Sequence, residues 1–249
     1  MAAASTVLPV AAACVLGLFA ARAEGGPIAF REVIVGAGIG RAAEPPIGRY
    51  QTDQGAEFVL DRSSGRALLK FDGDPEIWVL HPASGPRGDT IYRNDLGEEM
   101  VRATRLGGMT VFTQKRPDGS AAAFFSPCAP LRIPQLGPEG LALRFAQASD
   151  RATRAAQHAI EFETGRDAEP ETAGVIADAA TVASEALVGM AAAAPARAAL
   201  ARIIDVVITA GPRPAVALRQ GVLTVTVDPR QGFFGRPSSR VIERAAGAP

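Results

Sequence analysis

The sequence predicts an α+β fold, in which an antiparallel β-meander or small open barrel is followed by an alanine-rich helical segment and a C-terminal β-hairpin. Three stretches of the 249-residue chain indicate this fold. Residues 48–113 alternate short β-branched or aromatic runs with glycine turns, residues 171–194 are apolar and rich in alanine, and residues 215–227 have a strand–turn–strand pattern. We therefore expect a β-hairpin meander over 48–135 and a mixed helical region over 136–249, packed on the sheet as one domain.

The first 23 residues are typical of a secretory signal peptide. Residues 7–21 are almost wholly apolar, and the tripeptide Ala-Arg-Ala at 21–23 matches a signal-peptidase cleavage pattern, although no Lys or Arg precedes the apolar run. The run is shorter than the roughly 20 residues that span a bilayer. We expect cleavage near Ala23, a mature chain that begins at Glu24, and a periplasmic or secreted protein. Lipid attachment at Cys14 is the weaker alternative.

A Gly/Pro-rich lead-in follows at residues 24–47. Gly36 and Gly38 match the start of the dinucleotide-binding fingerprint G-x-G-x-x-G, but Arg41 occupies the third glycine position. Two prolines begin at Pro45, and proline inside a helix costs about 3 kcal/mol, so the helix that would hold a pyrophosphate does not fit here. The sequence predicts no nucleotide site and no cofactor.

Two hairpin patterns follow the lead-in. Segments 58–71 and 90–103 each contain two apolar or β-branched runs around a turn that ends in glycine, Gly65 in the first and Gly97 in the second. The two segments overlay without a gap at a spacing of 32 residues. Such repetition predicts an antiparallel meander.

Further strands are expected around these hairpins. Segment 110–125 is expected to turn at the Pro-Asp-Gly sequence that ends at Gly119. Residues 77–82 form another apolar run, and Trp78 within it is expected to be a buried core anchor.

The region after residue 135 mixes strand and helix patterns. The expected elements, in chain order, are a strand at 141–145, a helix that opens at Ser149, a strand at 159–164, helices at 171–194 and 195–210, the strand–turn–strand, and a closing helix capped by Ser238 or Ser239.

Composition argues against a nucleic-acid partner, an internal disulfide and a transmembrane helix. The 26 basic and 26 acidic residues balance, so no net field favours nucleic acid. Cys128 would be the single cysteine after cleavage, which leaves no internal disulfide. The apolar stretch 174–194 carries Asp178 and Glu185, and a central acid costs about 3 kcal/mol in a membrane helix. We expect a helix of a soluble protein there and no transmembrane segment in the mature chain.

Catalytic candidates are few. His81 follows the Trp78 run, with Ser84 and Asp89 close in sequence, and these three are the only weak candidates for a catalytic site. A Ser-His-Asp site is defined by geometry, and no G-x-S-x-G nucleophile elbow is present. A histidine at the end of a strand is the favoured interpretation of His81.

Metal binding is not expected. Asp72, Asp74 and Glu76 occupy alternate positions that a hard cation can use, but the twelve-residue calcium loop is absent and a polar turn between strands explains them. The two histidines of the chain lack the paired spacing of a zinc site.

Residues 45–80 and 85–113, together with the leading apolar segment, resemble a family of secreted alphaproteobacterial proteins that is named only as a domain of unknown function. The resemblance implies an exported protein and provides no catalytic residues to carry over to this chain.

Three functions follow from these observations. The favoured one is a non-catalytic periplasmic protein that binds an envelope protein or a glycan. The alternatives are a small periplasmic hydrolase that uses His81, and a secreted protease inhibitor whose rigid loop would be residues 81–89.

Overall fold

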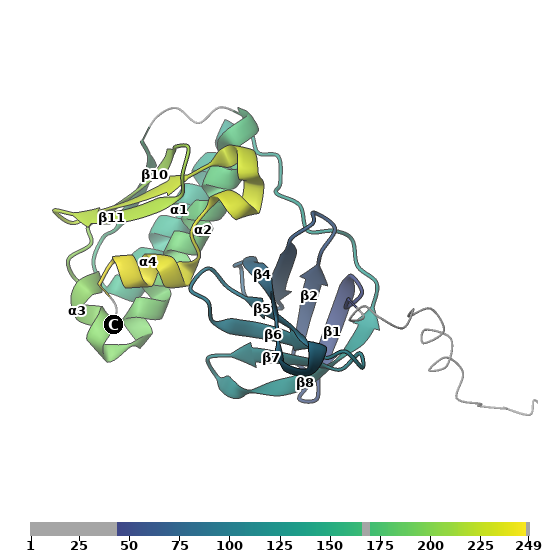
Figure 1. The fold of residues 1–249 in the computed structure, drawn as a ribbon. Helices are drawn as coiled ribbons and strands as arrows, with labels where there is room; N and C mark the ends of the chain where they lie inside the picture. Colours follow the sequence, from purple (N-terminus) through teal and green to yellow (C-terminus); the bar gives the residue numbers. More distant parts are fainter. Residues whose placement is uncertain (1–43, 166–169, 248–249) are drawn as a thin grey trace, which may run out of the picture. The chain divides into compact units, whose positions relative to one another are not determined.

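The computed structural model describes residues 44–165 and 170–247. The predicted signal peptide, the glycine-rich segment before residue 44 and the incomplete dinucleotide-binding fingerprint within it lie outside the described residues. The helices and strands, in chain order, are β1 (Gly48–Thr52), β2 (Glu57–Asp61), β3 (Ala67–Phe71), β4 (Trp78–Ser84), the 3-10 turn η1 (Pro86–Gly88), β5 (Thr90–Arg93), β6 (Glu99–Ala103), β7 (Met109–Thr113), β8 (Arg116–Ser126), α1 (Pro138–Ala156), β9 (Glu161–Thr164), α2 (Pro170–Ala192), α3 (Ala194–Leu200), β10 (Asp205–Ala210), β11 (Ala215–Arg219), β12 (Val222–Val227), the 3-10 segment η2 (Pro229–Gly235) and α4 (Ser239–Ala245) (Figure 1).

Strands β1 to β8 form a closed antiparallel barrel, so the predicted α+β fold is confirmed and the meander closes on itself through β8 and β1. Large side chains fill the interior, where the rings of Tyr50 and Phe58 stack with centroids 5.4 Å apart. An eight-stranded barrel is just wide enough for side chains to fill. Trp78 packs against this core while remaining half-buried, which confirms the predicted anchor in part.

Glycine turns close most of the hairpins. In the β1–β2, β5–β6 and β6–β7 turns, a glycine with positive φ donates its amide to the carbonyl three residues earlier; at Gly97 this bond to Asn94 is 3.0 Å long and φ is +80°. Gly65 occupies the same position in the β2–β3 turn, also with φ of +80°. Both glycines therefore lie in hairpin turns, as the sequence predicts.

The prediction that Gly119 lies in the turn of the third hairpin is wrong. The tip between β7 and β8 is at Gln114 and Lys115, and Gly119 lies within β8 at a shift of register. Its φ is +83°, and a Cβ there would lie 2.5 Å from Cγ2 of Thr110. The Pro-Asp-Gly sequence is thus a bulge that brings β8 against β7, which has the same residue preference as a turn.

The barrel contains two copies of a three-strand unit, 42 residues apart in the sequence. β1, β2 and β3 begin at positions 48, 57 and 67, and β5, β6 and β7 begin at positions 90, 99 and 109. Identical residues at this spacing include Tyr50/Tyr92, Asp53/Asp95, Gly55/Gly97, Glu57/Glu99, Val59/Val101 and Gly65/Gly107. The expected 32-residue overlay relates two hairpins but misses this larger unit.

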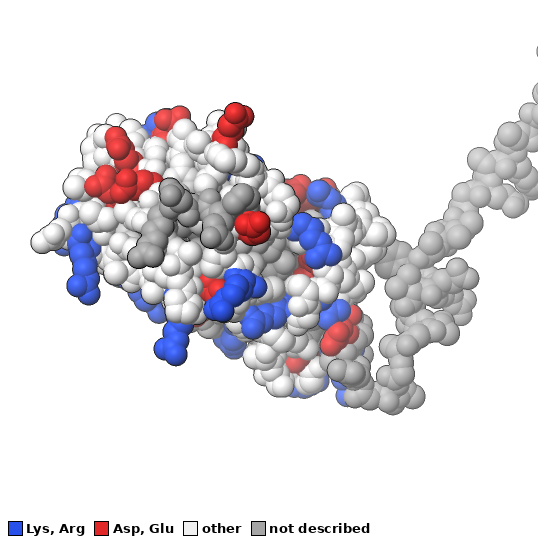
Figure 2. All heavy atoms as spheres, turned by 90° about the horizontal axis from the view of Figure 1, so that it is seen from above, with Lys and Arg blue, Asp and Glu red and all other residues white. Residues whose placement is uncertain are grey.

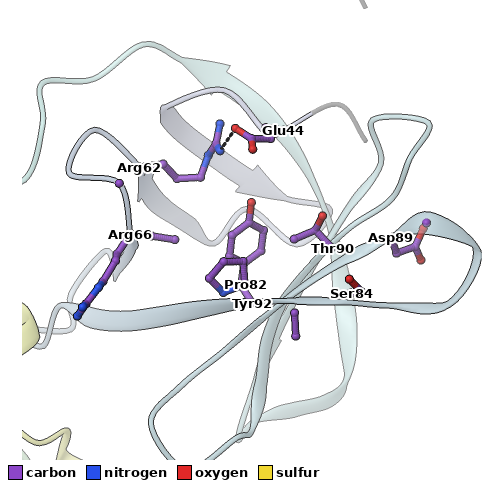
Figure 3. Close-up of a pocket in the computed structure, with 12 residues that line it drawn as sticks. Glu44, Arg62, Arg66, Pro82, Ser84, Asp89, Thr90 and Tyr92 are labelled. Atoms are coloured by element: carbon purple, nitrogen blue, oxygen red, sulfur yellow. Dashed lines mark hydrogen bonds and ion pairs between the residues drawn. The ribbon is translucent and has the colours of Figure 1, made fainter. Parts of the chain in front are cut away.

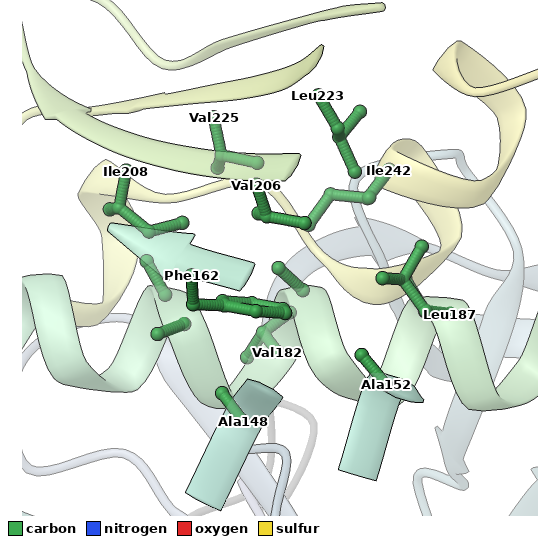
Figure 4. Close-up of a cluster of buried hydrophobic side chains, with 14 of the residues drawn as sticks. Ala148, Ala152, Phe162, Val182, Leu187, Val206, Ile208, Leu223, Val225 and Ile242 are labelled. Carbon is green, nitrogen blue, oxygen red and sulfur yellow. The ribbon is translucent and has the colours of Figure 1, made fainter. Parts of the chain in front are cut away.

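The second half of the described chain is a four-stranded sheet, in the order β11-β12-β10-β9, with helices packed on one face. β9, β10 and β12 are parallel, and β11 is antiparallel to β12. Side chains from β9, β10 and β12 point toward α2, and alanines of α1 complete the core (Figure 4).

Three expectations for this half are wrong. Ser149 does not open a helix but lies within α1, where its hydroxyl accepts a hydrogen bond from the Phe162 amide. Residues 141–145 belong to α1, which begins at Pro138, because five alternating residues do not distinguish a strand from a helix. The helix expected to reach Ala210 ends at Leu200, and residues 205–210 are the strand β10, whose β-branched residues favour a sheet. The strand–turn–strand and the closing helix capped by Ser238 are confirmed.

Helix α2 is the central helix of this core. By length and composition alone it would pass as a membrane span, with a mean hydropathy of 1.5, but 61% of its most apolar stretch is buried within the structure. Its alanines allow α1 to pack closely across it, and Val182 and Leu187 are fully buried.

A buried polar network joins the barrel to the helical half. The Arg236 side chain is 1% exposed, pairs with Asp178 of α2, and donates a 2.7 Å hydrogen bond to the Ile77 carbonyl just before β4. Its Nη1 lies 3.8 Å from the carboxylate of Glu76, which is itself 2% exposed. One guanidinium thus connects both halves.

The start of α4 completes this network. Ser239 donates to Glu76 from its amide at 3.1 Å and from its hydroxyl at 2.5 Å. Ser238 caps α4 and donates to Asp95, in the β5–β6 turn, at 2.9 and 2.6 Å. Glu76 and Asp95 of the barrel therefore serve as acceptors for the helix terminus, whereas Asp72 pairs with Arg49.

We predict that Gly97→Val lowers the free energy of unfolding by about 1 kcal/mol or more, because an L-residue is strained at positive φ. No atom lies within 4 Å of a Cβ placed there, so the loss would report backbone strain alone. Gly140→Ala, within α1, is the control and should leave stability unchanged or raise it. Urea denaturation measures both, and an unchanged midpoint for Gly97→Val would contradict the assigned turn.

A second prediction concerns pH. Burial raises the pKa of Glu76 to about 7, against the lowering effects of Arg236 and the Ser239 hydrogen bonds. Because this folded-state pKa lies above the unfolded value, the stabilisation is complete below about pH 4.5 and is lost as pH rises through about 7. The stability of the wild type relative to Glu76→Gln should therefore fall by more than about 1 kcal/mol between pH 5 and 8.

Denaturation at a series of pH values measures this difference. Glu139→Gln, an exposed change at the start of α1, is the matched control and should follow the wild type across the range. A wild-type advantage over Glu76→Gln that stays constant or rises with pH would show that the pKa of Glu76 is not raised.

Candidate functional site

The candidate site is a cavity at one end of the barrel. Its volume is about 480 Å3, within the range of about 300–1,000 Å3 typical of small-ligand sites. It lies where β2 and β4 end and where β3 and β5 begin (Figure 3). The lining residues are Glu44, Arg62, Gly65, Arg66, Ala67, Pro82, Ala83, Ser84, Gly88, Asp89, Thr90 and Tyr92.

Arg62 fixes one wall of the cavity. Its Nε donates to the Pro45 carbonyl at 3.0 Å, and its Nη1 pairs with Glu44 at 2.6 Å. The Arg62 side chain is 20% exposed and that of Glu44 is 59% exposed. These contacts hold the chain that enters β1 across the end of the barrel.

Tyr92 forms the floor below this ion pair. Its hydroxyl points toward Arg62 and Glu44 (Figure 3), and its residue is 3% exposed. Burial raises the pKa of Tyr92, while the neighbouring Arg62 lowers it. The phenol is therefore a neutral hydrogen-bonding group at ordinary pH, suited to a polar ligand rather than to nucleophilic attack.

Tyr50 occupies the equivalent position in the first half of the repeat but has a different role. Its hydroxyl donates to the Pro46 carbonyl at 2.6 Å, and burial raises its pKa as well. Tyr50 is absent from the cavity lining, so one of the two repeat-related tyrosines anchors the chain and the other faces the cavity.

Two further hydroxyl groups are available at the cavity. Neither the Ser84 nor the Thr90 hydroxyl forms a hydrogen bond with residues 44–165 or 170–247, although both line the cavity (Figure 3). The guanidinium of Arg66 lies 4.9 Å from the ring centroid of Phe234 in η2, which holds the Arg66 side chain at the rim. Asp89 accepts a 3.4 Å hydrogen bond from the amide of Arg105.

The structure brings two of the three catalytic candidates to this cavity. Ser84 and Asp89 line it, whereas His81 is exposed on β4, is paired in register with Arg93, and lies outside the lining. His81 forms no hydrogen bond with the described residues. The hypothesis of a hydrolase centred on His81 therefore lacks an assembled Ser-His-Asp geometry here.

The loop proposed for protease inhibition is a short connection within the barrel. The Gly85 amide donates to the Asp89 carbonyl at 2.8 Å, and the Asp89 amide donates to the Pro86 carbonyl at 3.1 Å. Arg87, at its tip, is exposed with φ of +57°. This conformation differs from the extended backbone that pairs with another strand.

In the described residues, no group of three or more His, Cys, Asp or Glu side chains is placed to hold a metal ion. Cys128 is half-buried, and burial raises the pKa of its thiol, as does the nearby Asp61. A raised pKa keeps the thiol protonated and unreactive.

Sequence reasoning missed Arg62, Tyr92 and Thr90 as site residues. A signal was present, because the chain has only two tyrosines and they lie 42 positions apart at equivalent points of the repeat. The convergence of Arg62 and Tyr92 depends on barrel closure, which no local pattern reveals.

Comparison with known proteins gives a family but no relative of known activity. Searches of curated proteins and of solved structures found no match. A family model described as a domain of unknown function, DUF4908, matches residues 29–246, which include both the barrel and the helical half. The chain therefore belongs to the DUF4908 family.

Proposed function

We propose that the protein is an exported, non-catalytic binding protein whose barrel-end cavity holds a neutral, hydroxyl-rich ligand such as the sugar units of an envelope glycan. The observation that carries this proposal is the set of hydroxyl groups on Ser84, Thr90 and Tyr92 around one cavity. Hydroxyl groups both donate and accept hydrogen bonds, as sugar hydroxyls do.

The charges of the cavity support a neutral ligand. Arg62 and Arg66 line it together with Glu44 and Asp89, so the formal charges balance. Acidic and basic side chains are also interspersed on the face drawn in Figure 2, where neither sign dominates. An anionic ligand would need cationic side chains in excess, and a cationic ligand would need acidic ones.

The apolar residues of the cavity lining are consistent with a ligand that has an apolar face. Ala67, Pro82 and Ala83 line the cavity beside the polar groups, and a sugar ring presents C–H groups on one side and hydroxyls at its edge. The lining comes from paired strands and tight turns, so the groups are held in place before a ligand arrives.

Export is supported by the leading sequence. The apolar run at 7–21 and the cleavage pattern at 21–23 favour secretion, and a periplasmic or secreted location would place the cavity where envelope glycans occur. N-terminal sequencing of the exported protein tests this part separately, with Glu24 as the expected first residue.

We predict that Tyr92→Phe weakens binding of a neutral oligosaccharide by about 3- to 10-fold, because it removes one hydrogen-bonding group and keeps the ring. Tyr50→Phe is the matched control, since it removes the hydroxyl at the repeat-related position outside the cavity. It should lower stability through loss of the bond to Pro46 and leave affinity unchanged. Isothermal titration of the full mature chain measures both.

The probes are neutral oligosaccharides, acidic oligosaccharides and inorganic phosphate. Saturable binding of a neutral probe, weakened by Tyr92→Phe alone, would support the proposal. Binding of phosphate in preference to neutral sugars would show that Arg62 and Arg66 dominate and would contradict it, as would equal losses in the two tyrosine variants.

A further inference from the structure

The four-stranded sheet has one face that its helices leave open. Side chains of β9, β10 and β12 that point toward the helices are buried, as Figure 4 shows for Phe162, Val206 and Val225. The alternate residues are half-buried or exposed and make up the open face. We define the open face as Glu161, Glu163, Asp205, Val207, Thr209, Ala215, Ala217, Arg219, Val222, Thr224 and Thr226.

Charge is distributed unevenly across the open face. Glu161 and Glu163 lie on β9, at one edge, and Asp205 is in register beside Glu161. Arg219 lies on β11, at the opposite edge, in the same row through Val222. The face is therefore acidic on one side and basic on the other.

These charges are not neutralised within the described chain. Glu161, Glu163, Asp205 and Arg219 form no ion pair with residues 44–165 or 170–247. Other carboxylates of this half do pair, as Glu185 does with Arg151 and Asp178 with Arg236. The open face thus has charges of both signs available for a partner.

We propose that the open face is a homodimer interface, in which two copies stack face to face about a twofold axis parallel to the strands. This rotation places β9 of one copy over β11 of the other. Arg219 then faces Glu161 of the partner subunit, and symmetry repeats the pair on the other side. An axis perpendicular to the strands would instead place β9 over β9, with four glutamates together, so charge selects one arrangement.

The centre of the open face suits such stacking. Val207 and Thr224 are neighbours on β10 and β12, and the proposed axis opposes each to the other residue in the second copy. Flanking positions are small, with Ala215 and Ala217 on β11, so two sheets can approach to the usual distance of about 10 Å.

The size of the open face limits the affinity of the proposed dimer. The strands lie about 4.8 Å apart and rise about 3.3 Å per residue, and β9, β11, β10 and β12 have four, five, six and six residues, so the open face covers about 330 Å2 per copy. Interfaces of this size are at the small end, and they are weak and transient. We therefore expect a dimer that forms at high protein concentration and weakens as salt screens its ion pairs.

Sedimentation velocity of the full chain over a range of concentrations tests the proposal. Arg219→Glu should weaken dimerisation by at least about tenfold, because it opposes like charges. The double variant Arg219→Glu with Glu161→Arg should restore it, since both pairs are then reversed. Arg105→Glu, an equal charge change on the exposed β6–β7 turn, is the control and should leave dimerisation unchanged.

The double variant distinguishes an interface from a folding defect, because a misfolded single variant would not be rescued by a second surface change. Val207→Asp supplies an independent disruption at the centre. A chain that stays monomeric at every concentration, as it would if another protein covers the open face, overturns the proposal. A dimer that the charge reversal does not weaken, or that the double variant does not restore, also overturns it.

Discussion

The structure depends on one buried cation. Arg236 is almost fully enclosed, and a guanidinium out of water is tolerated only when its charge and hydrogen bonds are satisfied. Asp178 comes from the helical half, whereas Glu76 and the carbonyl of Ile77 come from the barrel. The partners of Arg236 are thus divided between the two halves, and neither half alone supplies the full set.

The shared partners of Arg236 link two hydrophobic cores that are otherwise separate. The barrel interior forms one cluster of buried side chains, and the sheet with α1, α2 and α4 forms another. The contacts between the halves are largely polar: Ser238 and Ser239 meet Asp95 and Glu76, and Arg66 covers Phe234. A polar junction specifies geometry more than it adds stability, since each group is satisfied in only one arrangement.

Barrel closure in turn creates the candidate site. Closing the eight strands fills the interior with side chains and leaves the ends as the places where polar groups gather. The 42-residue repeat puts a tyrosine at the same point in each half. Only Tyr92 faces the cavity, because Tyr50 is engaged by the chain at Pro46.

The sequence predicts those features that are encoded locally. The glycine turns at 65 and 97, the hairpin at 215–227 and the cap at Ser238 each depend on a few neighbouring residues, and each is found in the structure. The sequence predicts a turn at Gly119 where the structure has a bulge, because both need positive φ. It predicts a helix over β10 because the apolar run continues from α3.

The site was not predictable in the same way. Arg236 lies 159 positions from Ile77, and the cavity joins residue 44 to residues 62, 82 and 92. Contacts at such separations follow from strand order and closure, which periodicity does not determine. Histidine is rare in this chain, which makes His81 a candidate, but rarity alone does not assemble a site.

Native-state hydrogen exchange tests the central claim most directly. If Arg236 joins the halves into one cooperative unit, the slowest amides of the barrel core and of the α2 core should share one opening free energy in the wild type. In Arg236→Met the two sets should separate, because a buried carboxylate loses its partner and the halves open independently. Two different opening free energies in the wild type, unaltered by Arg236→Met, would contradict the account.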